Sequence, residues 1–131
     1  MGGRVLRLLG VYNAEGTLRG ELAYFVGARL GLTHCALCDI THGMLHERRA
    51  WQQCRETLPI PFVTFHLDDQ PDALRAVVQG HAPAVLAEVD DAGVSIVLLL
   101  GPEALQACHS SPEKLLQALY DALAKAQLVL G

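Results

Sequence analysis

The sequence predicts an α/β fold in which helices flank a mixed four-stranded sheet. Apolar runs typical of buried strands alternate with stretches whose apolar residues recur at helical spacing. Two of the apolar runs are joined by DDAG, a turn signal that predicts an antiparallel hairpin. Hydrophobic residues make up 51% of the 131-residue chain and charged residues 18%, a composition typical of a compact folded protein. We therefore expect one domain that spans residues 1–131.

The first half of the chain predicts one strand and two helices. RVLRLLGVYN, residues 4–13, is rich in apolar residues and ends at a turn-forming asparagine, so it predicts a buried strand. Residues 17–30 carry apolar side chains at helical spacing and predict the first helix. Residues 43–58 predict a second helix, in which Cys54 packs on the apolar face. A segment rich in cysteine and histidine, residues 33–43, lies between the two helices.

The second half predicts three strands and two helices. PFVTFHLDD, residues 61–69, carries apolar side chains on both faces, and we expect it to be a central strand. Residues 70–80 predict a short helix that ends at a glycine. Residues 81–100 predict the hairpin, and residues 110–130 predict a closing helix with Ser111 as its N-cap. The helices on each side of the strands then bury both faces of the sheet.

The segment THCALCDITHG, residues 33–43, concentrates the chemistry of the chain. Cys35 and Cys38 form a CxxC pair, and two cysteines at this spacing can close a disulfide when their side chains face each other. Nearby cationic groups such as Arg48 favour the reactive thiolate, whereas Asp39 opposes it. The sequence shows no signal for secretion, so reduced thiols are expected, and a CxxC pair in a reducing compartment is redox-active or binds metal.

Metal binding is the second interpretation of this segment. Cys35, Cys38, His42 and His46 make a C-x2-C-x3-H-x3-H set, and two thiolates with two imidazoles suit tetrahedral zinc. The spacing is tighter than in a zinc finger, and Gly43 makes the start of a helix between the histidines uncertain. The two thiolates would also suit copper(I) or an iron–sulfur cluster shared between subunits. In the third interpretation the cysteines are only small buried hydrophobic residues.

Other chemistry-bearing residues favour structural roles. Cys108 and His109 are adjacent in sequence, and neighbouring side chains rarely point at each other, so we expect a loop and no catalytic pair. His66 is expected to be a histidine at the end of a strand. Asp68, Asp69 and Asp72 lie together in HLDDQPD, a pattern that resembles a helix N-terminal cap more than a cation site.

In element order, the chain resembles the thioredoxin superfamily, most nearly the minimal glutaredoxin-like arrangement. The resemblance rests first on HAPAVLAEVDDAGVSIVLLL, residues 81–100, where Pro83 stands just before the first hairpin strand as the cis-proline of that family does. It rests also on SPEKLLQAL, residues 111–119, which is similar to the terminal helix of the family. The resemblance implies a thioredoxin-like mixed sheet, here with an inserted CxxC-bearing loop and helix.

The chain departs from that family in the position of its CxxC. In the family the motif follows the first strand and opens the first helix, whereas VYNAEGTLRGEL, residues 11–22, holds no cysteine. The CxxC follows the first predicted helix instead, so the redox mechanism of the family does not transfer position by position. The chain also resembles uncharacterised bacterial proteins that pair an early YNA, here Tyr12 to Ala14, with a later CxLCxxT.G, here Cys35 to Gly43. That resemblance implies no activity.

The charge and hydropathy of the chain disfavour several partners. The net charge of −4 provides no basic field that would attract nucleic acid or an anionic membrane. The longest apolar run, Val94 to Leu100, is far below the ~18 residues of a membrane span, and the N-terminus lacks a signal peptide pattern, so we expect a cytoplasmic protein.

These observations favour one function and leave two alternatives. We predict a thiol–disulfide redox protein or sensor that uses Cys35 and Cys38, with Cys35 as the nucleophile and no cofactor. Its partner would be a thiol- or disulfide-bearing protein or a small thiol. The alternatives are a zinc-binding protein that uses Cys35, Cys38, His42 and His46, and a non-catalytic interaction domain.

Overall fold

The computed structural model describes residues 3–12, 36–41 and 48–130, and within 36–41 it describes the side chains of Leu37, Ile40 and Thr41. In chain order the elements are β1 (Arg4–Val11), α2 (Ala36–Thr41), α3 (Arg49–Glu56), β2 (Phe62–Phe65), α4 (Asp72–Val78), β3 (Ala84–Asp90), β4 (Val94–Leu100), α5 (Pro102–Gln106), α6 (Pro112–Lys125) and β5 (Val129–Leu130). The helix expected over residues 17–30 lies outside the described residues.

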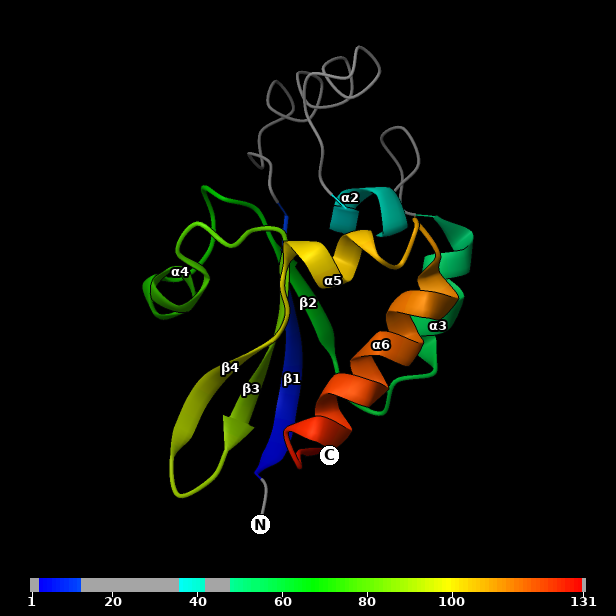
Figure 1. Ribbon diagram of the computed structural model, residues 1–131. Coiled ribbons are helices and arrows are strands. Elements are labelled where there is room, and N and C mark those ends of the chain that lie inside the picture. The colour runs from blue at the N-terminus through cyan, green and yellow to red at the C-terminus, as the bar shows by residue number, and fades with distance from the viewer. Residues whose placement is uncertain (1–2, 13–35, 42–47, 131) are drawn as a thin grey trace.

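The described strands form one mixed sheet of five strands. Its order is β2-β1-β3-β4, with β5 paired to β1 beside the start of that strand. β2 and β5 run parallel to β1, whereas β3 is antiparallel to β1 and β4 is antiparallel to β3. Helices lie on both sides of this sheet (Figure 1). The predicted class, an α/β fold with a mixed sheet flanked by helices, is confirmed.

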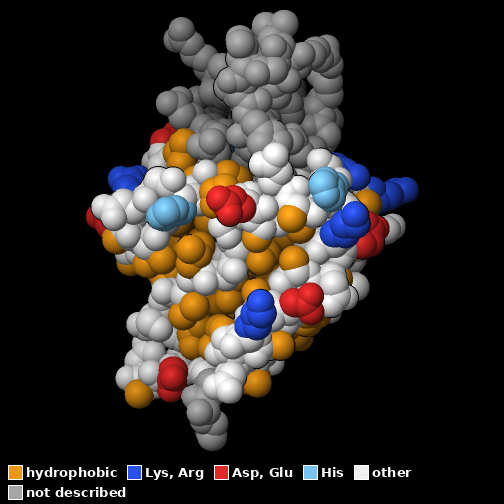
Figure 2. All heavy atoms as spheres, viewed as in Figure 1, with side chains coloured by type: hydrophobic (Ala, Val, Ile, Leu, Met, Phe, Trp, Pro, Cys, Tyr) orange, Lys and Arg blue, Asp and Glu red, His pale blue; other side chains and the backbone are white. Residues whose placement is uncertain are grey.

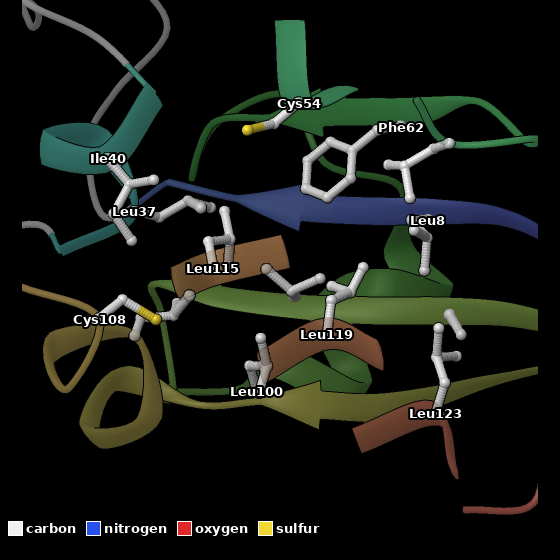
Figure 3. Close-up of a cluster of buried hydrophobic side chains, with 14 of the residues drawn as sticks. Leu8, Leu37, Ile40, Cys54, Phe62, Leu100, Cys108, Leu115, Leu119 and Leu123 are labelled. Carbon is white, nitrogen blue, oxygen red and sulfur yellow. The ribbon is translucent and has the colours of Figure 1, made fainter. Parts of the chain in front are cut away.

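Alternation along β1 and β3 builds a core on each face of the sheet. Because successive strand side chains point to opposite faces, Leu8 and Leu9 of β1 enter different cores. The larger core lies between the sheet and helices α2, α3, α5 and α6, and Figure 3 shows leucines of β1, β4 and α6 converging there. The smaller core packs Leu74 and Val78 of α4 against the opposite face. α4 accordingly lies on its own side of the sheet (Figure 1).

Two apolar residues of β4 are exposed, unlike the buried side chains of the two cores. Val94 is 66% exposed and Leu98 is 41% exposed. On the face drawn in Figure 2, apolar side chains gather over the centre, and acidic and basic side chains both lie around them. Leu98 is thus a partly exposed leucine, whereas the leucines of the core are buried.

The hairpin and the helix before it form as predicted. β3 pairs with β4 from Asp90 opposite Val94, and the turn between them uses Ala92 and Gly93, whose φ angles are 57° and 132°. A glycine tolerates such an angle because it has no Cβ. α4 is followed by Gly80 at φ 83°. The peptide bond that precedes Pro83, just before β3, is cis.

The prediction that residues 61–69 form a central strand is wrong. Among the described strands β2 pairs with β1 alone, so β2 lies at the edge and β1 takes the central position. The apolar alternation itself is present, since Phe62 belongs to the larger core while Val63 and Phe65 pack against the smaller one. Helices cover both faces of this edge strand, and side-chain burial on two faces does not distinguish an edge strand from a central one.

The closing helix is shorter than predicted, and the sheet has one strand more. α6 begins as expected, with the hydroxyl of Ser111 accepting a hydrogen bond from the backbone N–H of Lys114. The helix ends at Lys125, and Gln127 adopts a φ of 57°. Val129 and Leu130 then pair with Arg4 and Val5 as β5, so residues 129–130 are strand where helix was expected.

The boundaries of the second helix also differ from the prediction. The helix expected over residues 43–58 is α3, which begins at Arg49, and residues 42–47 lie outside the described residues. The preceding segment, expected to be a loop, contains the short helix α2. Leu37, Ile40 and Thr41 are all fully buried, and their i, i+3, i+4 spacing gives α2 a single face toward the core.

Candidate functional site

The four site residues predicted from the sequence lie in or beside α2. Cys38 is in the first turn of α2, and its side chain lies outside what the structure describes. Cys35 is the residue before the first helical residue, and it lies outside the described residues, as do His42 and His46. The described residues around this segment are those that hold α2 in place.

α2 packs on the carboxyl end of β1 through a glycine. A Cβ atom built on Gly10 would lie 3.0 Å from Cε1 of Phe62 and 3.3 Å from Cδ2 of Leu37, which belongs to α2. Leu37 and Ile40 point into the larger core beside Leu115 and Cys108 (Figure 3). The absence of a side chain at position 10 thus lets the helix approach the strand closely.

A buried hydrogen bond joins the end of β1 to α2. The hydroxyl of Tyr12, which is 3% exposed, lies 3.0 Å from Oγ1 of Thr41, which is fully buried. The Thr41 hydroxyl donates to the carbonyl of Leu37 at 3.1 Å. Because a threonine hydroxyl has one hydrogen, Tyr12 is the donor in its bond to Thr41. The chain of two bonds satisfies both hydroxyl groups inside the core, where an unpaired polar atom would be costly.

Arg48 holds the other end of α2. Its backbone N–H donates to the carbonyl of Thr41 at 2.7 Å, and its Nη1 donates to the carbonyl of Ile40 at 3.2 Å. The same Nη1 lies 2.6 Å from the carbonyl oxygen of Ser110, in the connection between α5 and α6. Carbonyls at the end of a helix have no partner within the helix, and a cationic donor there is favourable. Arg48 therefore ties α2 to the segment that precedes α6.

His66 and Asp69 lie on the other side of Tyr12. The rings of Tyr12 and His66 have their centroids 5.3 Å apart at an interplanar angle of 51°. Nδ1 of His66 lies 3.3 Å from Oδ2 of Asp69, and the backbone N–H of His66 donates to the other carboxylate oxygen. Of the aspartates expected at the start of a helix, Asp72 does lie in the first turn of α4. The expectation is wrong for Asp69, because its carboxylate closes the turn after β2, and Pro71 occupies the N-cap position of α4 without a side-chain hydrogen bond.

The two cysteines whose side chains are described are buried away from solvent. Cys54 is 9% exposed and Cys108 is 3% exposed, with Sγ of Cys108 donating to the carbonyl of Ala104. Burial raises the pKa of the Cys54 thiol, and Glu113 adds to this shift. Burial also raises the pKa of Cys108, against a smaller opposing effect of Lys114. Both residues pack as small hydrophobic side chains, as the sequence predicts for Cys54.

We expect Cys54 and Cys108 to react slowly with iodoacetamide in the folded Cys35→Ser/Cys38→Ser variant. A thiol whose pKa is raised above the ordinary 9.0 holds less thiolate at any pH below that value, and the thiolate is the nucleophile. Modification measured by mass spectrometry should be slower at pH 7 than that of a free thiol, and its rate should rise steadily with pH. In denaturant both thiols should react at the rate of a free thiol. Rapid modification of either residue in the folded chain at pH 7 would contradict this account.

The described residues contain neither a candidate metal site nor a candidate membrane-spanning helix. Within the described ranges, no three histidine, cysteine, aspartate or glutamate side chains come together in a way that could hold a metal ion. Among the helices of those ranges, none has the length and apolar composition needed to cross a bilayer.

The chain matches no family model, no curated protein and no solved structure.

The sequence analysis missed the interactions that hold α2. Tyr12 belongs to the YNA pattern and Thr41 to the CxLCxxT.G pattern, and neither pattern predicts the hydrogen bond between them. A tyrosine at the end of a buried strand needs a partner for its hydroxyl, and this requirement was the available signal. Arg48 was expected only to add positive charge near the cysteines. Its contact with Ser110, 62 positions away in sequence, has no local signal.

Proposed function

We propose that the protein is a thiol–disulfide redox protein in which Cys35 and Cys38 alternate between dithiol and disulfide. The observation that carries the proposal is the position of α2, since Cys38 lies in its first turn and Cys35 directly precedes its first residue, Ala36. Residues three apart in helical register are neighbours, with Cβ atoms about 5–6 Å apart before adjustment. The Cβ atoms of a disulfide are about 3.5–4.5 Å apart, so closing the disulfide from this spacing requires only a small rearrangement.

The buried face of α2 supports accessibility of the cysteine pair. Leu37, Ile40 and Thr41 occupy the side of the helix that faces the core. By helical spacing, position 38 lies outside the buried set formed by Leu37, Ile40 and Thr41. The proposed reaction requires both thiols to be reachable from solvent, in contrast to Cys54 and Cys108.

The proposed reaction is a two-electron exchange with a disulfide partner. The thiolate of Cys35 attacks one sulfur of the partner disulfide and forms a mixed disulfide with it. The other partner sulfur leaves as a thiol. The thiolate of Cys38 then attacks the Cys35 sulfur and releases the second partner thiol. The Cys35–Cys38 pair is oxidised by two electrons, the partner is reduced by two, and the protons of both cysteines pass to the partner thiols.

The thioredoxin-like resemblance supports the same proposal at the level of architecture. From residue 62 onward the order is strand, helix, two hairpin strands and two helices, with α6 packed against the sheet before the short strand β5. α2 contacts the end of β1 through Gly10 and Tyr12, although many residues separate them in sequence. The displaced CxxC is thus compatible with a position near the end of the first strand, where the family carries its motif.

Elemental analysis and thiol counting test the proposal against its alternatives. Protein purified without chelator should contain no stoichiometric zinc and should lose two of its four thiols on mild oxidation. In a matched Cys54→Ala/Cys108→Ala variant, both remaining thiols should be lost in the same step. Stoichiometric zinc with protected thiols would support the metal site of Cys35, Cys38, His42 and His46 instead. A protein that contains no zinc and keeps all four thiols after mild oxidation would contradict both interpretations and favour a non-catalytic interaction domain.

A further inference from the structure

We infer that the outer edge of β4 is a dimerisation surface, on which β4 of a second copy of this chain adds as an antiparallel strand. The register is centred on Ile96, so that Val94 of each copy lies opposite Leu98 of the other. The inference involves none of the residues of the proposed cysteine chemistry, and the two proposals can fail separately.

β4 lies at one edge of the sheet. In the order β2-β1-β3-β4 it is the last strand, and Figure 1 shows it on the outer side of β3. Within the described ranges β4 pairs with β3 alone. Every second residue of an edge strand directs its backbone N–H and C=O groups away from the sheet, where another strand can pair with them. The chemistry of this edge therefore fits an extended strand.

β4 lacks the features that usually keep a sheet edge from pairing. Such features are short length, charged side chains, proline and bulges. β4 has seven residues, none of them charged and none of them proline. Its register with β3 is regular from Val94 to Leu98, since the shift comes between Leu98 and Leu100. β2, at the other end of the strand order, has only four residues, so β4 is the long and unprotected edge.

The exposed apolar side chains of β4 match each other across a two-fold axis. Val94 and Leu98 are 66% and 41% exposed, and both lie on the face of Ile96, which packs against the smaller core. Residues directly opposite in an antiparallel pair share a face, with Cβ atoms about 4.5–5.5 Å apart. With Ile96 of the two copies opposite each other, each Val94 meets a Leu98. A symmetric dimer of this kind uses the same patch on both copies and removes both side chains from water.

The absence of charge on β4 favours its own copy as the partner. The two other described strands of at least seven residues carry ionised side chains, Arg4 and Arg7 on β1 and Glu88 and Asp90 on β3. A strand of that kind would bring a charge against the apolar side chains of β4 without a counter-ion, at a cost in desolvation. β4 opposite β4 joins two uncharged strips, so the net charge of −4 on each chain lies outside the paired segment.

The size of this edge limits the affinity. Seven residues at about 3.4 Å each span about 24 Å, and side chains reach roughly 5 Å to either side of a sheet, so each copy contributes a strip of about 240 Å². A standard interface uses about 800 Å² of each partner. The strip is too small for an obligate dimer, and we expect a reversible one with a dissociation constant of roughly 10–100 µM. At concentrations well below this range the chain is a monomer.

Sedimentation velocity of the full chain under reducing conditions tests the inference. Between about 1 and 300 µM protein the weight-average mass should rise from that of one chain, 14.1 kDa, toward twice that value. The reductant excludes disulfide-linked dimers. Val94→Lys/Leu98→Lys places two pairs of like charges opposite each other, so it should weaken dimerisation by about tenfold or more. A wild-type chain that stays at 14.1 kDa over the whole range would overturn the inference.

Val94→Lys/Leu98→Glu is the matched control. It removes the same two apolar side chains, but in the proposed register each lysine lies opposite a glutamate of the other copy. It should dimerise about tenfold or more tightly than the double lysine variant, and the difference should shrink in high salt. Because both positions are exposed, both variants should keep the circular dichroism spectrum of the wild type. Equal dissociation constants for the two folded variants would overturn the proposed pairing.

Discussion

Cys35→Ser should abolish the rapid reaction of the reduced protein with oxidised glutathione, and Cys38→Ser should stop that reaction at a mixed disulfide. The two outcomes differ because the two sulfurs have different tasks. Cys35 attacks first, so its loss leaves Cys38, whose proposed task is to attack the Cys35 sulfur, together with Cys54 and Cys108. The last two are buried thiols whose raised pKa values make them poor nucleophiles. Cys38 resolves the mixed disulfide, so its loss leaves glutathione attached to Cys35.

The expected size of the effect follows from intramolecularity. A neighbouring thiol held at a productive distance reacts far faster than the same thiol free in solution, and its removal should slow release of the second glutathione by on the order of 100-fold or more. Stopped-flow kinetics and intact-mass analysis measure the rate and the adduct of 1 glutathione per chain. Cys54→Ala/Cys108→Ala should react like the wild type. Equal rates for Cys35→Ser and the wild type would refute the assignment of the nucleophile.

Leu119→Ala should lower the free energy of unfolding by about 2–5 kcal/mol, the range measured for buried leucines in other proteins. Leu119 is 1% exposed and lies on α6 among side chains of the larger core (Figure 3). The substitution removes apolar contacts and leaves a cavity that the packed helices cannot fully close. Because α2 packs in the same core, loss of Leu119 should also weaken the region that carries the cysteine pair.

Leu98→Ala provides the matched surface control. Leu98 is 41% exposed on β4, so its truncation should change the free energy of unfolding by less than about 1 kcal/mol. Urea denaturation followed by circular dichroism measures both variants, and the denaturant slope should stay close to that of the wild type. A cost at Leu98 equal to that at Leu119 would contradict the assignment of the core.

Much of the fold could be predicted because it is encoded locally. Strand β1 follows from its apolar run, the hairpin from the turn signal at Ala92 and Gly93, and the start of α6 from the cap at Ser111. The helix within THCALCDITHG was also encoded, since Leu37, Ile40 and Thr41 have helical spacing. The sequence analysis placed a CxxC-bearing loop there and did not use this spacing.

The features that could not be predicted depend on contacts between distant segments. β5 exists because Val129 and Leu130 meet Arg4 and Val5, and nothing in the sequence near residue 129 indicates that partner. The edge position of β2 likewise depends on which strand lies on each side of β1.

In the candidate site, too, the motif is visible in the sequence, whereas the contacts between distant residues are not. The CxxC spacing is visible in the sequence, whereas the bond from Tyr12 to Thr41 spans 29 positions and requires the fold.

Peptide mapping of the protein after equilibration with oxidised and reduced glutathione tests the central claim most directly. The proposed function predicts one intramolecular disulfide, between Cys35 and Cys38, that forms and disappears reversibly as the glutathione ratio changes, while Cys54 and Cys108 remain thiols throughout. Cys35 and Cys38 that stay reduced in the most oxidising buffer, or that each pair with glutathione without joining each other, would contradict it.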